Sequence, residues 1–205
     1  MIVIIDYGLG NLGSILNMLK KIQAPAIISQ NPDEILKADK LILPGVGSFD
    51  NGMKNISELG LRDALDLRVI KEKIPILGIC LGLQLFTAAS EEGKLAGLGW
   101  LKARTIRFRV ESSPNNMRVP HMGWNSVNKA KDSVMLNGFT DDWRFYFVHS
   151  YHVVVDDEND ALLETHYGYN FVSAVEKDNI FGVQFHPEKS HRFGMQLLKN
   201  FAHSV

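Results

Sequence analysis

The 205-residue chain is predicted to adopt an α/β fold, with a largely parallel central sheet flanked by helices and additional antiparallel strands in the C-terminal half. Up to about Gly93, short apolar segments alternate with segments of helical periodicity, which is typical of βα units in a covered parallel sheet. Beyond Gly93, strand-like segments follow one another directly, which favours antiparallel pairing. We expect a single domain over residues 1–205, because no linker, repeat or low-complexity segment divides the chain.

The first half is expected to contain four strands and the helices between them. Helices are predicted over residues 10–22 and 31–38, the second with Asn31 as its cap and Pro32 at its first position. A further helix-like segment begins after Cys80. The strands are predicted at residues 1–6, 26–29 and 40–44, followed by an apolar strand that ends at Cys80.

The second half is expected to add strands and one closing helix. The last strand segment should be a hairpin that turns at Asp178 and Asn179, and the helix should begin at about His191. The strand segments are residues 100–110, 125–130, 144–155, 161–167 and 171–185.

Composition excludes several classes of protein. The formal net charge is -1, so neither a nucleic-acid partner nor an acidic disordered tail is indicated. No apolar stretch approaches the roughly 20 residues that cross a bilayer, so we expect no membrane partner. A single cysteine excludes an internal disulfide framework, and the N-terminus lacks the features of a signal peptide. A cytoplasmic location fits these observations best.

Cys80 lies in the segment KIPILGICLGLQLF, where an apolar run stops at a cysteine flanked by glycines. This layout is typical of a nucleophile elbow, in which a sharp strand-to-helix turn exposes the nucleophile. The first N–H groups of the following helix would favour a thiolate and could hold an oxyanion. The alternative interpretation is that Cys80 is a small buried hydrophobic residue.

A cysteine nucleophile needs a base, and the segment GVQFHPEKS offers His186 and Glu188 on either side of Pro187. Proline biases the preceding residue toward extended geometry, in which residues i and i+2 project to the same side. Glu188 could therefore orient the imidazole of His186, and the imidazole could accept and return the proton of Cys80. The alternative is an ordinary polar pair at the end of a strand.

Five motifs in this order resemble one family. They are PGVGSF at 44–49, GICLGLQLF at 78–86, PHMGWN at 120–125, FYFVHSY at 145–151 and FHPEKS at 185–190. The chain thereby resembles the class I glutamine amidotransferases, and more narrowly the glutaminase subunits of imidazole glycerol phosphate synthases. The resemblance covers nearly the whole chain. It implies that Cys80, His186 and Glu188 hydrolyse the side-chain amide of glutamine, with no metal and no cofactor.

The resemblance also implies an oxyanion hole and a glutamine site. The oxyanion would be held by the backbone of Gly45 and Val46 and by the N–H of Leu81. Gln84 lies one helical turn after Cys80, so its side chain should share a face with the nucleophile. Glu92 could bind the substrate ammonium and the backbone at residues 150–151 its carboxylate. The full set of implied substrate residues is Gly47, Gln84, Glu92, Ser150 and Tyr151.

In this family the ammonia passes to a partner enzyme, a (β/α)₈ barrel cyclase with which the glutaminase forms a heterodimer in histidine biosynthesis. The isolated glutaminase is expected to be nearly idle. A related glutaminase supplies a sugar amidotransferase in surface polysaccharide synthesis, and the tail KSHRFGMQLLKNF at 189–201 fits that branch as well. The interface residues that the resemblance implies are Gly8, Leu9, Gly10, Asn11, Met122, Trp124, Asn125 and Tyr146.

Two other functions have weaker support in the sequence. Gly8, Gly10 and Gly13 match the dinucleotide pattern G-x-G-x-x-G after a strand, but the acid that would bind ribose should end the second strand, where Gln30 and Asn31 lie. A tight turn with close helix packing would explain the glycines equally well. Metal binding is not expected, because the histidines match no zinc pattern, and His149 and His152 should lie on opposite faces of a strand.

Overall fold

The computed structural model describes residues 1–110, 117–140 and 142–205. Its main sheet has the strand order β2-β1-β3-β4-β12-β11-β10-β7; β9 pairs with β11, and β5 pairs with β9. The five strands from β2 to β12 pair in parallel, so the predicted α/β fold with a largely parallel sheet is confirmed. These parallel strands are β1 Ile2–Ile5, β2 Ala26–Ser29, β3 Lys40–Gly45, β4 Ile76–Cys80 and β12 Ile180–Val183.

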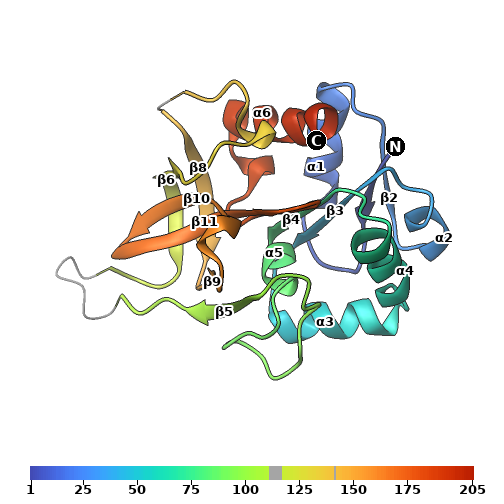
Figure 1. Cartoon of the computed structure of the whole chain (residues 1–205), viewed down its shortest axis with the longest axis horizontal. Coiled ribbons are helices and arrows are strands. Elements are labelled where there is room, and N and C mark those ends of the chain that lie inside the picture. Colours follow the sequence, from blue (N-terminus) through green and yellow to red (C-terminus); the bar gives the residue numbers. More distant parts are fainter. Residues whose placement is uncertain (111–116, 141) are drawn as a thin grey trace.

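Helices cover both faces of the parallel sheet (Figure 1). In β1, Ile2 and Ile4 join a core with α1 and α6, whereas Val3 and Ile5 join a second core with α2 to α5. Alternate residues of a strand point to opposite faces, so this strand is apolar throughout because it is buried twice. The helices are α1 Leu12–Lys21, α2 Pro32–Ile35, α3 Phe49–Glu58, α4 Arg62–Asp66, α5 Leu81–Leu85 and α6 His191–Ser204.

The C-terminal half supplies the antiparallel strands. The hairpin of β11 and β12 turns at Asp178 and Asn179, as predicted, with Asp178 at φ +51°. Two strands, β6 and β8, pair only with each other and form a separate sheet. The strands of this half are β5 Ala103–Arg107, β6 His121–Ser126, β7 Asn128–Lys129, β8 Arg144–His149, β9 Tyr151–Val155, β10 Ala161–Tyr167 and β11 Tyr169–Lys177.

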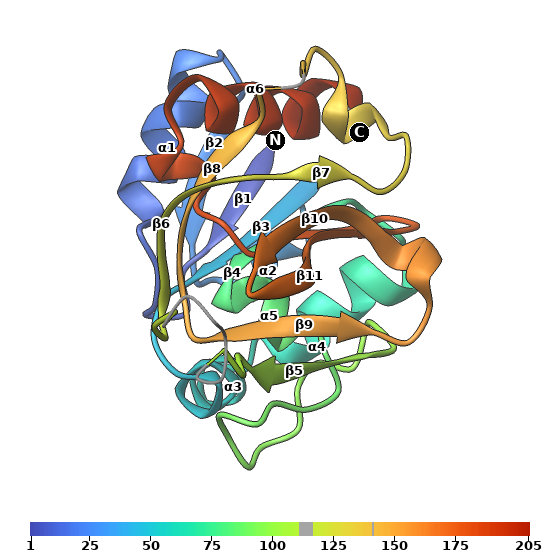
Figure 2. The same ribbon diagram turned by 90° about the vertical axis from the view of Figure 1, so that its left-hand side faces the viewer.

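Two predicted strands are wrong as single elements. The segment 144–155 is divided at Ser150, where the chain turns sharply between β8 and β9, and the two strands belong to different sheets (Figure 2). The segment 125–130 is divided at Val127, between β6 and β7. In residues 144–155 the apolar run does not reveal the break, because β8 and β9 both keep buried side chains, whereas both residues of β7 are exposed.

Two further differences concern helices. The second predicted helix is only Pro32–Ile35, although the side chain of Asn31 accepts the N–H of Asp33 at 3.0 Å, as expected of a cap. Helices α3 and α4 and the π-helical turn Leu67–Lys71 had no predicted counterpart. None of the helices in the described ranges combines the length and the apolar character that a membrane span requires.

Candidate active site

Cys80 is the last residue of β4 and stands at a strained turn. Its backbone has φ +53° and ψ −107°, a region that residues with a side chain seldom adopt. The adjoining strand β3 lies in register, with Gly45 beside Cys80. The following helix is pressed onto the sheet, because a Cβ at Gly82 would lie 1.8 Å from the carbonyl oxygen of Leu43. The turn is therefore set by packing on both sides of Cys80.

The helix after Cys80 is shorter than a typical helix, with five residues. It therefore offers a few local N–H groups next to Cys80 and no long helix dipole.

His186 lies next to Cys80, at the end of the neighbouring strand. Strand β12 pairs with β4 in parallel, and His186 follows it after two residues. Nδ1 of His186 lies 2.8 Å from Oε1 of Glu188, and both side chains are at most 2% exposed. The contact arises differently from the expected extended geometry, since Glu188 belongs to a 3₁₀ turn, Pro187–Lys189, that folds its carboxylate back toward the imidazole.

The electrostatic state of His186 suits a partner of a thiolate. Burial alone would lower the pKa of the imidazole, but the interactions with Cys80 and then with Glu188 outweigh it and raise this pKa to about 10. Within the described residues, Nε2 of His186 has no hydrogen-bond partner of ordinary geometry. This nitrogen is therefore available to exchange a proton with Cys80 or with a bound substrate.

Two glutamine side chains complete the surroundings of the nucleophile. Nε2 of Gln84 donates to the backbone oxygen of Tyr151 and to Oε1 of Gln184, both at 3.1 Å. Nε2 of Gln184 in turn lies 3.6 Å from Sγ of Cys80. Gln184 is fully buried and was not a predicted site residue. The alternation in VQFHPE could have indicated it, because Gln184 and His186 are two residues apart in an extended segment.

The comparisons with known proteins identify the family. The model of the family described as glutamine amidotransferase class-I matches residues 3–205. The chain belongs to the class I glutamine amidotransferases. A protein from Methanococcus maripaludis named imidazole glycerol phosphate synthase subunit HisH 2 is 55% identical over 201 residues, 98% of either chain. A protein of the same name from Pseudomonas aeruginosa is 50% identical over 205 residues, 100% of either chain.

Solved structures agree on the class I amidotransferase fold. A structure described as glutamine amidotransferase superposes with a TM-score of 0.74 at 18% identity, covering 97% of this chain and 96% of that one. PurLQS from Thermotoga maritima superposes with a TM-score of 0.71 at 16% identity, covering 98% of this chain and 96% of that one. At these identities the likeness concerns the fold alone.

The predicted oxyanion loop of this amidotransferase follows β3. Gly45 ends the strand, Val46 is 42% exposed, and Gly47 has φ +113°. A Cβ at Gly45 would lie 2.2 Å from the hydroxyl of Tyr7 and 2.9 Å from Cβ of Leu81, so only glycine fits between them. Gly45 and Leu81, two of the predicted oxyanion residues, are thus brought together.

The remaining predicted substrate residues approach from two sides. Oε2 of Glu92 accepts the N–H of Phe49 at 2.8 Å, which brings Glu92 to the start of α3 just after the oxyanion loop. Burial raises the pKa of Glu92, and the N–H of Phe49 partly offsets this. Ser150 forms the break between β8 and β9, and the backbone oxygen of Tyr151 accepts from Gln84.

The predicted partner residues form two groups. Met122 is 62% exposed and Trp124 is 44% exposed, and the ring of Trp124 stacks on His191 and meets Tyr146 edge-on. Tyr146 and Asn125 are only partly exposed. The loop at residues 8–11 lies beside the oxyanion loop, since a Cβ at Gly10 would lie 3.3 Å from Pro44.

The dinucleotide interpretation loses its structural basis here. Gly8 and Gly10 have positive φ and form a turn, but a Cβ at Gly13 would meet nothing within 4 Å, so close helix packing does not require this glycine. The nearest acids, Asp33 and Glu34, lie in the first turn of α2, not at the end of β2 where an acid that binds ribose would be needed.

The prediction that His149 and His152 lie on opposite faces of one strand is wrong. Because the chain turns at Ser150, both histidines pack against the ring of Phe108, at 5.1 and 4.7 Å between ring centroids. Among the described residues, no group of three or more histidine, cysteine or acidic side chains is arranged to hold a metal ion.

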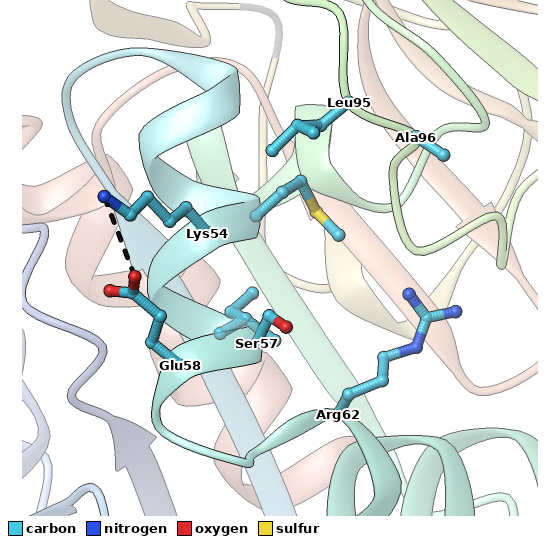
Figure 3. A pocket seen from close by; sticks show the side chains of 8 residues that line it. Lys54, Ser57, Glu58, Arg62, Leu95 and Ala96 are labelled. Atoms are coloured by element: carbon cyan, nitrogen blue, oxygen red, sulfur yellow. Dashed lines mark ion pairs between the residues drawn. The ribbon is translucent and has the colours of Figure 1, made fainter.

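A separate pocket lies between α3, the start of α4 and residues 95–96 (Figure 3). Lys54 and Glu58 form an ion pair along its α3 wall, with 3.7 Å between Nζ and Oε1. None of its lining residues belongs to the candidate site. They are Met53, Lys54, Ile56, Ser57, Glu58, Arg62, Leu95 and Ala96.

Proposed function

We propose that this chain is the glutaminase subunit of an imidazole glycerol phosphate synthase, which hydrolyses glutamine and delivers ammonia to a (β/α)₈ barrel cyclase. The observation that carries the chemistry is the strained Cys80 beside an imidazole whose other nitrogen contacts Glu188 at 2.8 Å. Full-length relatives named as HisH subunits, at 55% and 50% identity, support the narrower assignment.

The reaction proceeds through a thioester. The thiolate of Cys80 attacks the side-chain carbonyl carbon of glutamine and forms a tetrahedral oxyanion. His186 then donates its Nε2 proton to the amide nitrogen, and the C–N bond breaks. Ammonia departs, and the γ-glutamyl group remains bound to Sγ as a thioester. The neutral imidazole next removes a proton from water, which attacks the thioester. Glutamate is released, and the thiolate and the imidazolium are restored.

Glu188 acts through His186. Its carboxylate holds the Nδ1 proton, fixes the tautomer and stabilises the imidazolium that must protonate the leaving ammonia. The N–H groups of Leu81 and of the Gly45–Val46 backbone are proposed to receive the oxyanion. Removing such a donor typically costs on the order of 100-fold to 1,000-fold in rate. The substrate ammonium is assigned to Glu92, and its carboxylate to the backbone at Ser150 and Tyr151.

The docking face is assigned to the exposed side of β6 and the loop at residues 8–11. Exposed Met122 and Trp124 are of the residue types that anchor protein interfaces. Free ammonia is largely protonated near neutral pH and would be a poor nucleophile, which supports direct transfer to a partner.

The test measures glutamate release by the chain alone and with a barrel cyclase and its nucleotide substrate. We expect strong stimulation in the mixture and none with Cys80→Ala. The mixture containing Cys80→Ala should still form the cyclase product from added ammonia, which controls for an active cyclase. Stimulation by a sugar amidotransferase in place of the cyclase would keep the glutaminase chemistry and replace the pathway. In the mixture with the cyclase and its substrate, glutamate release by Cys80→Ala at the rate of the unmodified chain would contradict the proposal.

A further inference from the structure

A buried chain of hydrogen bonds runs from β6 to the glutamine site. Nδ2 of Asn125 lies 3.1 Å from Nε2 of His121, whose Nδ1 lies 2.9 Å from Nε2 of His149. Nδ1 of His149 lies 2.7 Å from the backbone oxygen of Tyr151. His121 and His149 are 3% and 6% exposed, so water does not replace these contacts. We call these four residues the histidine relay.

The proton positions in the histidine relay follow from its two ends. The oxygen of Tyr151 can only accept, so Nδ1 of His149 carries a proton, and a neutral His149 must then accept at Nε2. That proton comes from Nδ1 of His121, which leaves Nε2 of His121 as an acceptor.

The opposite end requires the same arrangement. Oδ1 of Asn125 accepts the N–H of Ser126 at 2.8 Å, and Nδ2 of Asn125 donates to the oxygen of His166 at 3.0 Å. The Asn125 amide is thereby oriented with its nitrogen toward His121. Both ends therefore agree that every donor in the relay points from β6 toward Tyr151.

The relay continues to the nucleophile through the glutamines described above. The oxygen of Tyr151 also accepts from Gln84, which donates to Gln184, and Gln184 lies 3.6 Å from Sγ of Cys80. Since each link is buried or partly buried, a displacement at one end leaves polar groups unpaired along the path.

Strand β6 carries two kinds of side chain on its two faces. Met122 and Trp124 are exposed, whereas His121 and Asn125 point inward and belong to the relay. Alternation along a strand requires this division. A partner seated on the outer face of β6 therefore acts directly on the strand that holds the start of the relay.

We propose that His121 and His149 are positioning residues. Through their hydrogen bonds, the position of β6 determines the positions of the Tyr151 backbone and the Gln84 side chain in the glutamine site. The proposal rests on the proposed function for the identity of the substrate. It assigns neither histidine a contact with the reacting atoms.

The charge state of the relay is consistent with this role. Burial lowers the pKa of His121 to about 4 and the pKa of His149 well below its ordinary value. Both imidazoles therefore remain neutral near pH 7, and each keeps one donor and one acceptor. A protonated imidazole would have two donors and would break one link.

The first test reads the proton positions without any activity. Imidazole ¹⁵N spectra of the full chain at pH 7 should show His121 and His149 as neutral Nδ1–H tautomers. Cys80→Ala is the control variant, because it removes the sulfur of the nucleophile and leaves the four residues of the histidine relay unchanged. An Nε2–H tautomer at either histidine, or a charged imidazole at pH 7, would overturn the relay even if glutaminase activity is present.

The second test separates hydrogen bonding from packing. His121→Leu removes the donor to His149, whereas His121→Asn keeps a nitrogen at the position of Nδ1. His152→Leu is the matched control, because His152 packs against the same Phe108 ring but contacts Tyr169 outside the relay. In the complex with the cyclase, His121→Leu should raise the KM for glutamine about tenfold, and His121→Asn should restore most of it.

Each outcome of the second test decides the role. Equal KM values for His121→Leu and His152→Leu would assign His121 to packing alone and refute the coupling. The coupling is also refuted if His121→Asn has the same KM for glutamine as His121→Leu, provided that the three variants unfold within a few degrees of the parent. If the parent itself releases no glutamate, the proposed function fails, and the ¹⁵N spectra still decide whether the relay exists.

Discussion

Gly82 gives the sharpest test of how packing sets the nucleophile turn. A Cβ at this position would lie 1.8 Å from the carbonyl oxygen of Leu43 and 2.8 Å from its carbonyl carbon. Ordinary carbon–oxygen contact is about 3.3 Å, so Gly82→Ala requires a backbone shift of more than about 1 Å in either β3 or α5. No side chain can move aside to make room, because the obstacle is backbone.

The expected cost follows from this geometry. Overpacking typically destabilises a core by about 1–3 kcal/mol, and a backbone obstacle belongs at the upper end. We therefore expect Gly82→Ala to lower the free energy of unfolding by ~3 kcal/mol. A displacement of about 1 Å at Cys80, two residues earlier, should also reduce kcat/KM for glutamine by about 100-fold or more.

Gly13→Ala is the matched control, since a Cβ there meets nothing within 4 Å and the residue is helical and exposed. It should raise the free energy of unfolding by up to ~1 kcal/mol. Urea unfolding followed by circular dichroism, together with glutaminase rates, measures both variants. If Gly82→Ala unfolds at the parent's urea midpoint with unchanged kcat/KM, the packing account of the turn is refuted.

Three further predictions test other parts of the site. The pKa of His186 is about 10, above its free value of 6.5, so the stabilisation from its bound proton is fully present below pH 6.5 and disappears as the pH rises toward 10. Glu188→Gln should therefore lower the alkaline limb of the glutaminase pH profile by about one unit and reduce stability more at pH 7 than at pH 10; identical profiles would contradict this. Within the described residues the Tyr7 hydroxyl is buried without a hydrogen-bond partner. Tyr7→Phe should therefore leave the free energy of unfolding unchanged or raise it by ~1 kcal/mol. A decrease of more than ~1 kcal/mol, measured by urea unfolding, would show that the hydroxyl has a partner. Trp124→Ala should weaken binding of the barrel cyclase about tenfold or more, as measured by titration calorimetry. Leu36 is exposed next to α2, on the side of the molecule far from β6, so Leu36→Ala should not weaken binding (Figure 1). Equal affinities of the two variants would place the docking face elsewhere.

The order of β1, α1, β2, α2, β3 and β4 could be predicted because it depends on local patterns, whereas α3 and α4 were missed. Apolar runs marked the buried strands, and a cap at Asn31 with Pro32 marked the start of a helix. The turn at Cys80 could be predicted for the same reason, since glycines flank it in the sequence. The pairing of β4 with β12, which brings His186 beside Cys80, spans about one hundred residues and follows from topology instead.

What could not be predicted depends on long-range contacts. The turn at Ser150 separates β8 from β9, yet the sequence there reads as one continuous strand. Gln184 contacts Cys80 only because two distant strands are neighbours. His121 and His149 face each other through the pairing of β6 with β8, which no periodicity reveals. Alternation in VQFHPE could indicate that Gln184 shares a face with His186, but which residues these buried polar side chains contact depends on the tertiary fold.

The most direct test of the central claim is to trap the γ-glutamyl thioester on Cys80. Glutamine is turned over by the complex, the reaction is quenched with acid, and the peptide containing Cys80 is examined by mass spectrometry. We predict that the Cys80 peptide carries the added mass of one γ-glutamyl group. The same active complex incubated with glutamate in place of glutamine should lack this added mass. A glutamyl group on another residue, or steady glutamate release with no modified Cys80 at any quench time, would contradict the account.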